Sequence, residues 1–155
     1  GPSLRVVASH KNNDFEENKN IKKLIKLEKL QKIDQFNTYL KFSHNVNKKI
    51  YKLRNKLLNL HKKKNLLACY TAPAKGNTLL NALKLKKDLF EFVTENNSRK
   101  LNKYTPGTHL KIVSDNKLIK LKIKYALLLS WNYKKFFLKN SEFIKKGGKF
   151  IYPFS

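Results

Sequence analysis

The chain has 155 residues, which is enough for one compact domain with an extension and too few for two full domains. Apolar residues make up 41% of it, which excludes wholesale disorder, and the longest purely apolar run, about 125–129, is too short to span a membrane. A single cysteine, Cys69, excludes an internal disulfide and a multi-cysteine zinc site. With no signal peptide in view, we expect a protein of the reducing cytoplasm.

The net charge of +25 leaves two interpretations open. A charge of this size attracts polyanions, so a lysine-rich protein that binds nucleic acid is one candidate. Only three of the basic residues are arginines, however, whereas base recognition and bidentate phosphate contacts favour arginine. Asn, Ile, Phe and Tyr are also abundant, as an AT-rich genome would produce. Nucleic acid is therefore the alternative partner and not the preferred one.

The N-terminal part is predicted to be mainly helical. Residues 4–8 (Leu-Arg-Val-Val-Ala) predict a short strand, and a polar linker follows to residue 13, where Asn13 or Asp14 is a candidate helix cap. Over 14–64, apolar residues recur at three- and four-residue steps, which predicts a long amphipathic helix with residues 43–47 as a candidate bend. Its lysines are expected to face solvent. The repeating apolar positions are Ile33, Phe36, Leu40, Ile50, Leu53, Leu57 and Leu60.

From residue 65 to 155 the pattern alternates between strands and helices. The run 125–130 is apolar throughout, which is typical of a central parallel strand covered on both faces. This alternation predicts an α/β, Rossmann-like, three-layer domain with about five mostly parallel strands. The predicted strands are 66–70, 89–94, 110–113, 125–130 and 150–152. The predicted helices include Leu79, Leu80 and Leu83, residues 114–121, and one helix through Phe136, Phe137, Phe143 and Ile144, which ends at Gly147 and Gly148.

The first candidate binding segment is 71–78 (Thr-Ala-Pro-Ala-Lys-Gly-Asn-Thr), directly after the first strand of the sheet. Small residues there allow a ligand to approach the backbone, and the start of a helix offers unpaired N–H groups to a phosphate. Lys75 would add a cation. A plain turn with an exposed lysine explains the segment equally well, and its spacing is not that of a P-loop.

Two further loops carry candidate residues. If the strand order is 3-2-1-4-5, the loop with Trp131 and Asn132 shares one crevice with the first segment, because both follow neighbouring strands at the topological switch point. Trp131 can stack on a base or a sugar, although core packing is its more common role. His109, in the Pro-Gly turn of 104–109, can contact a diphosphate or simply hold the turn. Glu95 ends the second strand where related folds bind a ribose hydroxyl, but a surface carboxylate is the simpler interpretation.

Several motifs are absent from the sequence. The five glycines form no Gly-x-Gly motif for a nucleotide cofactor, and no Ser-His-acid set or pair of spaced carboxylates stands out. The sequence therefore predicts no catalytic residues and no metal site.

Four motifs resemble the C-methyltransferase C-terminal domain family. Residues 69–81 (Cys-Tyr-Thr-Ala-Pro-Ala-Lys-Gly-Asn-Thr-Leu-Leu-Asn) are similar to its Gly-Tyr-Gly-Ala-Pro-Ala-Lys-Gly-Asn-Thr-Leu-Leu-Asn signature. Residues 104–109 resemble its Pro-Gly-Thr-His segment, 125–133 its Leu-Leu-Leu-Ala-Trp-Asn segment, and 147–151 its Gly-Gly-Lys-Phe-Ile segment. Four motifs in the right order are far more specific than any one of them.

The resemblance implies a function. Members of the family methylate a carbon of nucleotide-linked keto-deoxysugars, and their C-terminal domain helps to hold the nucleotide sugar. The S-adenosylmethionine site and the catalytic base lie mostly in a preceding domain, of which residues 1–13 look like a remnant. The chain thus resembles the substrate-binding last third of such an enzyme, expected to bind no cofactor, to be inactive alone, and to act with an S-adenosylmethionine-binding domain upstream or in trans. The substrate-binding residues that the resemblance implies are Thr71, Ala74, Lys75, Gly76, Asn77, Thr108, His109, Trp131 and Asn132.

The sequence departs from the family pattern at several positions. Cys69 and Thr71 replace two glycines, which narrows the approach of a phosphate. Asn102 stands where glycine is common, and asparagine tolerates the left-handed conformation. Glu95 replaces a typical aspartate and Lys111 a typical proline. These changes leave the expected fold intact and bear on the choice of substrate.

Overall fold

The structure is a computed structural model that describes residues 4–12 and 19–154. Contacts between residues divide the chain into two units, Gly1–Val46 and Asn47–Ser155. The candidate cap at Asn13 or Asp14 lies outside the described residues. None of the helices in the described ranges is long and apolar enough to cross a membrane.

The first unit is helical and has no buried core among its described residues. Helix α1 spans Lys19–Leu30 without burying a residue, and α2, which spans Phe36–Lys62, continues into the second unit. The strand predicted at 4–8 is wrong, because residues 4–10 have no regular structure and Leu4, Val6 and Val7 are at least 70% exposed. A strand needs a neighbour for its backbone groups, and no described residue pairs with this segment.

The helical segment is broken, but not where the sequence suggested. Residues 31–35 separate α1 from α2, and Lys32 adopts a left-handed conformation (φ 54°) just after α1. The candidate bend at 43–47 is wrong, since α2 runs through it without interruption. Residues such as Ser43 and Asn45 are weak helix formers, yet a 27-residue helix is cooperative enough to outweigh a few of them.

The second unit contains a five-stranded sheet in which every strand is parallel to its neighbours. The order is β3-β2-β1-β4-β5, which confirms both the predicted fold class and the predicted strand order. Cys69 of β1 lies opposite Val93 of β2 and Leu127 of β4. The strands are β1 (Leu67–Tyr70), β2 (Val93–Thr94), β3 (Ile112–Val113), β4 (Tyr125–Leu128) and β5 (Lys149–Ile151).

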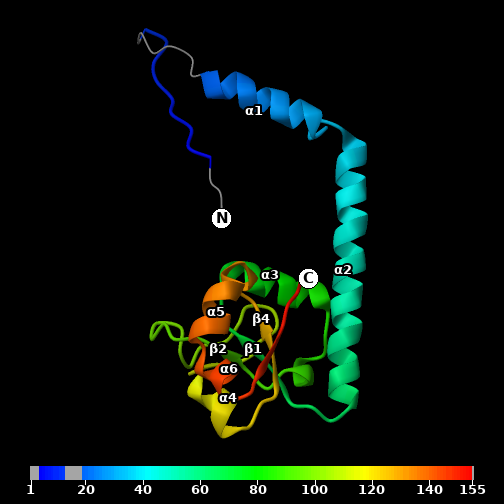
Figure 1. The fold of residues 1–155 in the computed structure, drawn as a ribbon, viewed down its shortest axis with the longest axis vertical. Helices are drawn as coiled ribbons and strands as arrows, with labels where there is room; N and C mark the ends of the chain where they lie inside the picture. The colour runs from blue at the N-terminus through cyan, green and yellow to red at the C-terminus, as the bar shows by residue number, and fades with distance from the viewer. Residues whose placement is uncertain (1–3, 13–18, 155) are drawn as a thin grey trace. The chain divides into compact units, whose positions relative to one another are not determined.

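Helices cover both faces of the sheet, as a three-layer domain requires. The alternation of side chains along β4 sends Leu127 to one face and Leu128 to the other. The first face packs against residues 47–62 of α2 and against α3 (Ala74–Leu83). The second face packs against α4 (Asn116–Lys120), α5 (Lys134–Asn140) and α6 (Glu142–Lys145) (Figure 1). The side chains of α5 and α6 that pack on it are Phe137, Phe143 and Ile144.

Two elements are shorter than the sequence indicated. The single helix predicted through residues 136–144 is two helices, α5 (Lys134–Asn140) and α6 (Glu142–Lys145), because Ser141 between them is extended. The second strand begins only at Val93, since Leu89 belongs to the 3-10 turn Lys87–Leu89. A second 3-10 turn, Trp131–Tyr133, leads from β4 into α5.

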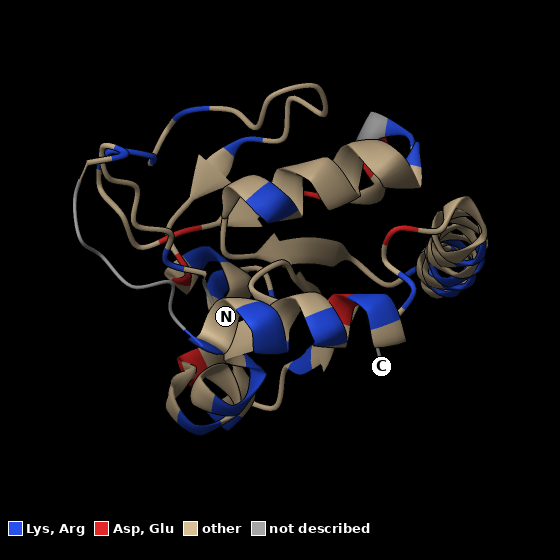
Figure 2. Ribbon diagram, turned by 90° about the horizontal axis from the view of Figure 1, so that it is seen from above, with Lys and Arg blue, Asp and Glu red and all other residues tan. Residues whose placement is uncertain are grey.

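Most described lysines and arginines lie on helices and loops, Lys149 begins the edge strand β5, and the central strands β1 and β4 carry none (Figure 2). No lysine or arginine is found among the buried side chains of the described residues. The charge is therefore a surface property, and the core is an ordinary apolar one.

Candidate functional site

The turn between β1 and α3 begins with a threonine in an unusual conformation. Thr71 has φ 67°, a region that β-branched residues rarely occupy. Its Oγ1 lies 2.6 Å from Tyr70 O and 2.8 Å from Ser130 Oγ, both within hydrogen-bonding distance. The hydroxyl therefore ties the end of β1 to the end of β4 and offsets part of the backbone strain that a glycine at this position would avoid.

An ion pair holds the next residue of the turn. Lys100 Nζ donates to Ala72 O at 2.9 Å and pairs with Glu95 Oε2 at 3.3 Å, while the Ala72 amide donates to the same Glu95 oxygen at 3.3 Å. Burial alone would raise the pKa of Glu95, but hydrogen bonds from the Asn96 amide and from Lys100 lower it. Glu95 thus supports the turn as a carboxylate, which is more than the surface role that its position suggested.

The first turn of α3 packs directly on Leu129, the residue that follows β4. A Cβ added at Gly76 would lie 2.6 Å from Leu129 Cβ, so only glycine allows the helix to approach this closely. The backbone N–H groups of Ala74 and Lys75 begin the helix and have no acceptor within it. The helix start therefore presents donors and a positive dipole end beside the strand ends.

Lys75, Trp131 and Asn132 come together next to this helix start. The Lys75 ammonium donates a hydrogen bond to Asn132 Oδ1 and lies 4.4 Å from the centroid of the Trp131 ring. Phe154 meets the same ring edge-on, with 5.1 Å between centroids. The sequence predicted that these side chains, from the loops after β1 and β4, would lie close together, and they contact one another.

Thr108 and His109 belong to a different loop, and Thr108 lies beside the C-terminal half of α3. The Thr108 hydroxyl is 2.7 Å from that of Thr105, and Thr108 lines a hollow of about 200 Å³ beside the C-terminal half of the helix, next to Asn81 and Lys84. His109 is exposed and has φ 52°. Neither contacts Lys75 or Trp131 in the described part of the chain, so the structure does not bring them to that cluster.

A larger hollow lies between α3 and residues 100–106. It has a volume of about 420 Å³ and is lined by Ala74 and Asn77, with Lys100, Lys103 and Tyr104 on the opposite side. Asn77 Oδ1 is buried and has no hydrogen-bond partner in the described residues. Sequence reasoning missed Lys100 and Lys103 here, because nothing in their spacing shows that the loop folds back over the start of α3.

The single cysteine is not poised to react. Cys69 is fully buried, and burial raises the pKa of its thiol well above the usual value, so the thiolate that a nucleophile or metal ligand requires is disfavoured. Within 4–12 and 19–154, no three His, Cys, Asp or Glu residues are grouped to hold a metal ion.

Comparison with known proteins gives two findings. The family model of the C-methyltransferase C-terminal domain matches the chain over residues 1–155. The C-methyltransferase NovU of Streptomyces niveus is 29% identical over 154 residues, which are 99% of this chain and 37% of the relative. The chain thus spans little more than a third of the length of this curated relative. Both findings confirm the resemblance that the four motifs carry.

Proposed function

The chain belongs to the C-methyltransferase C-terminal domain family, and from that premise we propose that it holds a nucleotide-linked sugar for a methyl transfer carried out by another domain. In this proposal S-adenosylmethionine and the catalytic base belong to a domain that acts upstream or in trans. The described residues supply charge, hydrogen bonds and a turn held by the Glu95–Lys100 pair, which are features suited to binding a substrate. The chain alone is therefore proposed to bind the substrate without turning it over.

The observation that carries the proposal is the position of the Lys75 ammonium. Trp131 and Asn132 restrain it at the N-terminus of α3, where β1 and β4 are neighbours at the topological switch point. Free backbone N–H groups and the positive end of the helix dipole favour an anion at the same place. A diphosphate would gain all three interactions, and the lysine would lose little freedom on binding because it is already held.

The remaining predicted residues divide by position. Thr71 and Gly76 shape the turn, while Ala74 and Asn77 line the hollow that also contains Lys100 and Lys103. We propose that this hollow takes another part of the same ligand. Thr108 and His109 stay predictions for the diphosphate, because only a ligand that extends along α3 would reach them.

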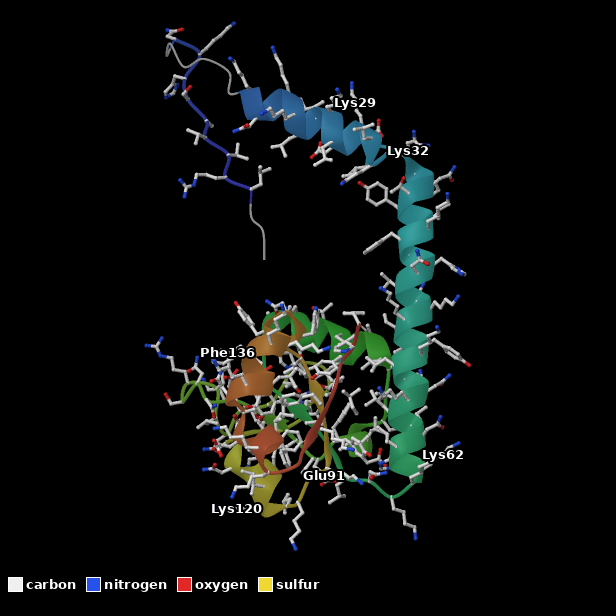
Figure 3. The ribbon with its side chains drawn as sticks, viewed as in Figure 1. Lys29, Lys32, Lys62, Glu91, Lys120 and Phe136 are labelled. Carbon is white, nitrogen blue, oxygen red and sulfur yellow. The ribbon has the colours of Figure 1, made fainter. Side chains whose placement is uncertain are left out.

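Fluorescence of Trp131, the single tryptophan, tests the proposal. Titration with a nucleoside-diphosphate sugar should give a saturable change. Lys75→Met should weaken binding about tenfold, because a hydrogen bond to a charged group contributes roughly 1.5–3 kcal/mol. Lys120→Met on α4 is the matched control and should bind as the wild type does (Figure 3). No response of the wild type at millimolar ligand would count against the site.

The same preparation separates the proposal from polyanion binding. A protein whose lysines bind nucleic acid would show affinity for generic DNA or RNA that falls steeply with salt and that Lys75→Met leaves unchanged. Nucleic-acid binding of that kind, without a response to the nucleotide sugar, would favour the alternative. Methyl transfer from S-adenosylmethionine by this chain alone would contradict the assignment of catalysis to another domain.

A further inference from the structure

Another hollow, distinct from the two beside α3, opens on the opposite face of the sheet at the carboxyl end of β1. It has a volume of about 370 Å³, within the range of small-molecule pockets. Tyr70 at the end of β1 forms one wall, the loops after β2 and β3 contribute Asn96 and Asp115, and α5 contributes Phe136. Tyr70 belongs to the apolar core between the sheet and helices α4–α6. The sheet therefore lies between this hollow and the α3 side, which carries Lys75.

The lining of the hollow differs in chemistry from the rest of the surface. It includes four aromatic rings and two carboxylates, and no lysine or arginine, although lysine and arginine make up 35 of the 155 residues. Phe136 is 58% exposed and is available at the rim (Figure 3). Its ring meets Phe137 edge-on at 5.3 Å, and Phe137 meets Tyr70 in the same way at 5.3 Å. Aromatic rings beside a carboxylate form an environment that attracts a cation.

Asp115 is the carboxylate that lacks a cationic partner. Its Oδ2 accepts hydrogen bonds from the Tyr70 hydroxyl and from Asn96 Nδ2, both at 3.0 Å. The ion pairs found between described residues do not include Asp115, whereas Glu142 is paired with Lys145 at 2.6 Å. Burial raises the pKa of Tyr70 to about 12, so the phenol stays a neutral donor. Two neutral donors hold the carboxylate in place and leave its charge uncompensated.

Ser141 adds an unsatisfied acceptor to the same wall. It is 3% exposed, and its Oγ has no hydrogen-bond partner among the described residues. The hydroxyl also lies near that of Tyr70, where it lowers the pKa of the phenol against the larger effect of burial. Buried hydroxyls in native proteins are nearly always paired, so a ligand with a polar atom in the hollow can complete the hydrogen bonding of Ser141.

We propose that this hollow binds a small organic molecule through a cationic ammonium group, which contacts the Asp115 carboxylate and the rings of Phe136 and Phe137. The ammonium supplies the positive partner that the Asp115 carboxylate lacks. A donor on the ligand can also satisfy Ser141, and the aromatic walls attract the cation through their ring faces. This inference is independent of the proposed function, because no residue of the Lys75 cluster lines the hollow.

The net charge of +25 opposes a cation, and this gives the proposal a distinctive salt dependence. Surface lysines repel the ligand over long distances, and salt screens that repulsion beyond roughly 8 Å at physiological ionic strength. Contacts with the half-buried Asp115 are screened much less. Affinity should therefore hold or rise as salt increases, which is the opposite of polyanion binding at the lysines.

A matched pair of ligands tests the proposal. Choline and 3,3-dimethylbutan-1-ol have nearly the same shape, but only choline carries the positive nitrogen; ethanolamine provides a primary ammonium. The amide signals of residues 114–116 and 140–142 in NMR spectra of the full chain should shift saturably with choline or ethanolamine, and about tenfold more weakly with the neutral alcohol. Equal responses to the neutral alcohol, or none to either cation by about 10 mM, would overturn the proposal.

Two variants locate the site and separate it from the nucleotide-sugar site. Asp115→Asn keeps the shape and should weaken cation binding about tenfold, while Phe136→Ala, at an exposed position, should weaken it about threefold. Lys75→Met should leave cation binding unchanged, and Asp115→Asn should leave the nucleotide-sugar response of Trp131 unchanged. Cation binding that survives both Asp115→Asn and Phe136→Ala would disprove the assignment, whatever the outcome for the nucleotide sugar.

Discussion

The two faces of the sheet differ most at the end of β1, where consecutive residues lead to opposite chemistry. Tyr70 belongs to a lysine-free, aromatic hollow with an uncompensated carboxylate, whereas Thr71 opens the turn that carries Lys75 to the start of α3. The alternation of side chains along a strand is enough to separate the two environments. In the two proposals, therefore, a few neighbouring side chains, and not the net charge of the chain, set the sign of the charge that each site attracts.

The two faces also differ in the interactions that stabilise the backbone and side chains on each of them. On the α3 face the backbone is restrained by two polar links, the Thr71 hydroxyl and the Glu95–Lys100 pair, and by close packing at Gly76. On the α4–α6 face, rings pack around Tyr70, and Asp115 and Asn96 form the polar network. Substitutions on the first face should disturb the conformation of the turn, and those on the second should mainly change packing.

The largest expected effects test whether the faces unfold together. Leu127 and Leu128 are neighbours in β4, both fully buried, and they point to opposite faces. Leu127→Ala and Leu128→Ala should each lower the free energy of unfolding by about 2–5 kcal/mol in urea titrations. Leu138→Ala, on exposed α5, is the control and should cost well under half as much. If Leu128→Ala did not shift the urea unfolding transition that Trp131 fluorescence reports, the two faces would unfold independently.

The close approach of α3 to β4 predicts the next effect. Gly76→Ala should destabilise the fold by about 1–3 kcal/mol, because the new methyl group meets Leu129 and pushes the helix start away from the sheet. Nucleotide-sugar binding should weaken with it, while cation binding on the other face should not change at equal folded fraction. Thr78→Ala, exposed in the same helix, serves as the control. Unchanged stability in Gly76→Ala would mean that the contact is not tight.

Thr71 allows strain and hydrogen bonding to be separated. Thr71→Val keeps the branched side chain at positive φ but loses the hydroxyl, so it should cost about 1–2 kcal/mol. Thr71→Gly loses the same hydrogen bond but relieves the strain, so it should cost less than Thr71→Val. Thermal unfolding of both variants gives the order. The reverse order would show that Thr71 is not strained in the folded protein.

The smallest effect concerns pH and the ion pair on the α3 face. The folded-state pKa of Glu95 is lowered from 4.5, so the folded chain binds fewer protons than the unfolded chain in that range. Its stabilising contribution is complete above about 4.5 and is lost as pH falls through the lower folded-state pKa. The urea midpoint of the wild type should therefore fall further between pH 7 and the acid range than that of Glu95→Gln. If the urea midpoints of the two proteins fell equally with pH, Glu95 would not contribute to the pH dependence of stability.

Sequence reasoning found the sheet because its strands are short apolar runs bounded by polar turns. The run that contains β4 is apolar throughout, which predicted a central strand, and its place next to β1 agrees with the strand order that the sequence analysis assumed. The helix break at Lys32 could not be found, because a lysine in the left-handed conformation has no signal comparable to glycine or proline. The split at Ser141 was missed for the same reason, since serine occurs both at helix starts and within helices.

The candidate site was predicted where a motif is continuous and missed where a loop folds back. Lys75 and Gly76 follow β1 directly, and the strand order then places them near Trp131. The hydrogen bond between Tyr70 and Asp115 joins residues 45 positions apart, and the contact of Lys100 with Ala72 depends on the path of its loop. Periodicity carries no information on such paths. The binding roles themselves stay predictions until ligands are tested.

Cys69 lies at the centre of the sheet, fully buried and with a thiol that is disfavoured as a thiolate. As the single cysteine of the chain, it gives the protein a built-in reporter of opening. An alkylating reagent can modify it only when β1 separates from its neighbours, so the labelling rate measures how often the sheet opens. A ligand that binds the folded domain on either face should slow that labelling, which allows both proposed sites to be compared without any attached dye.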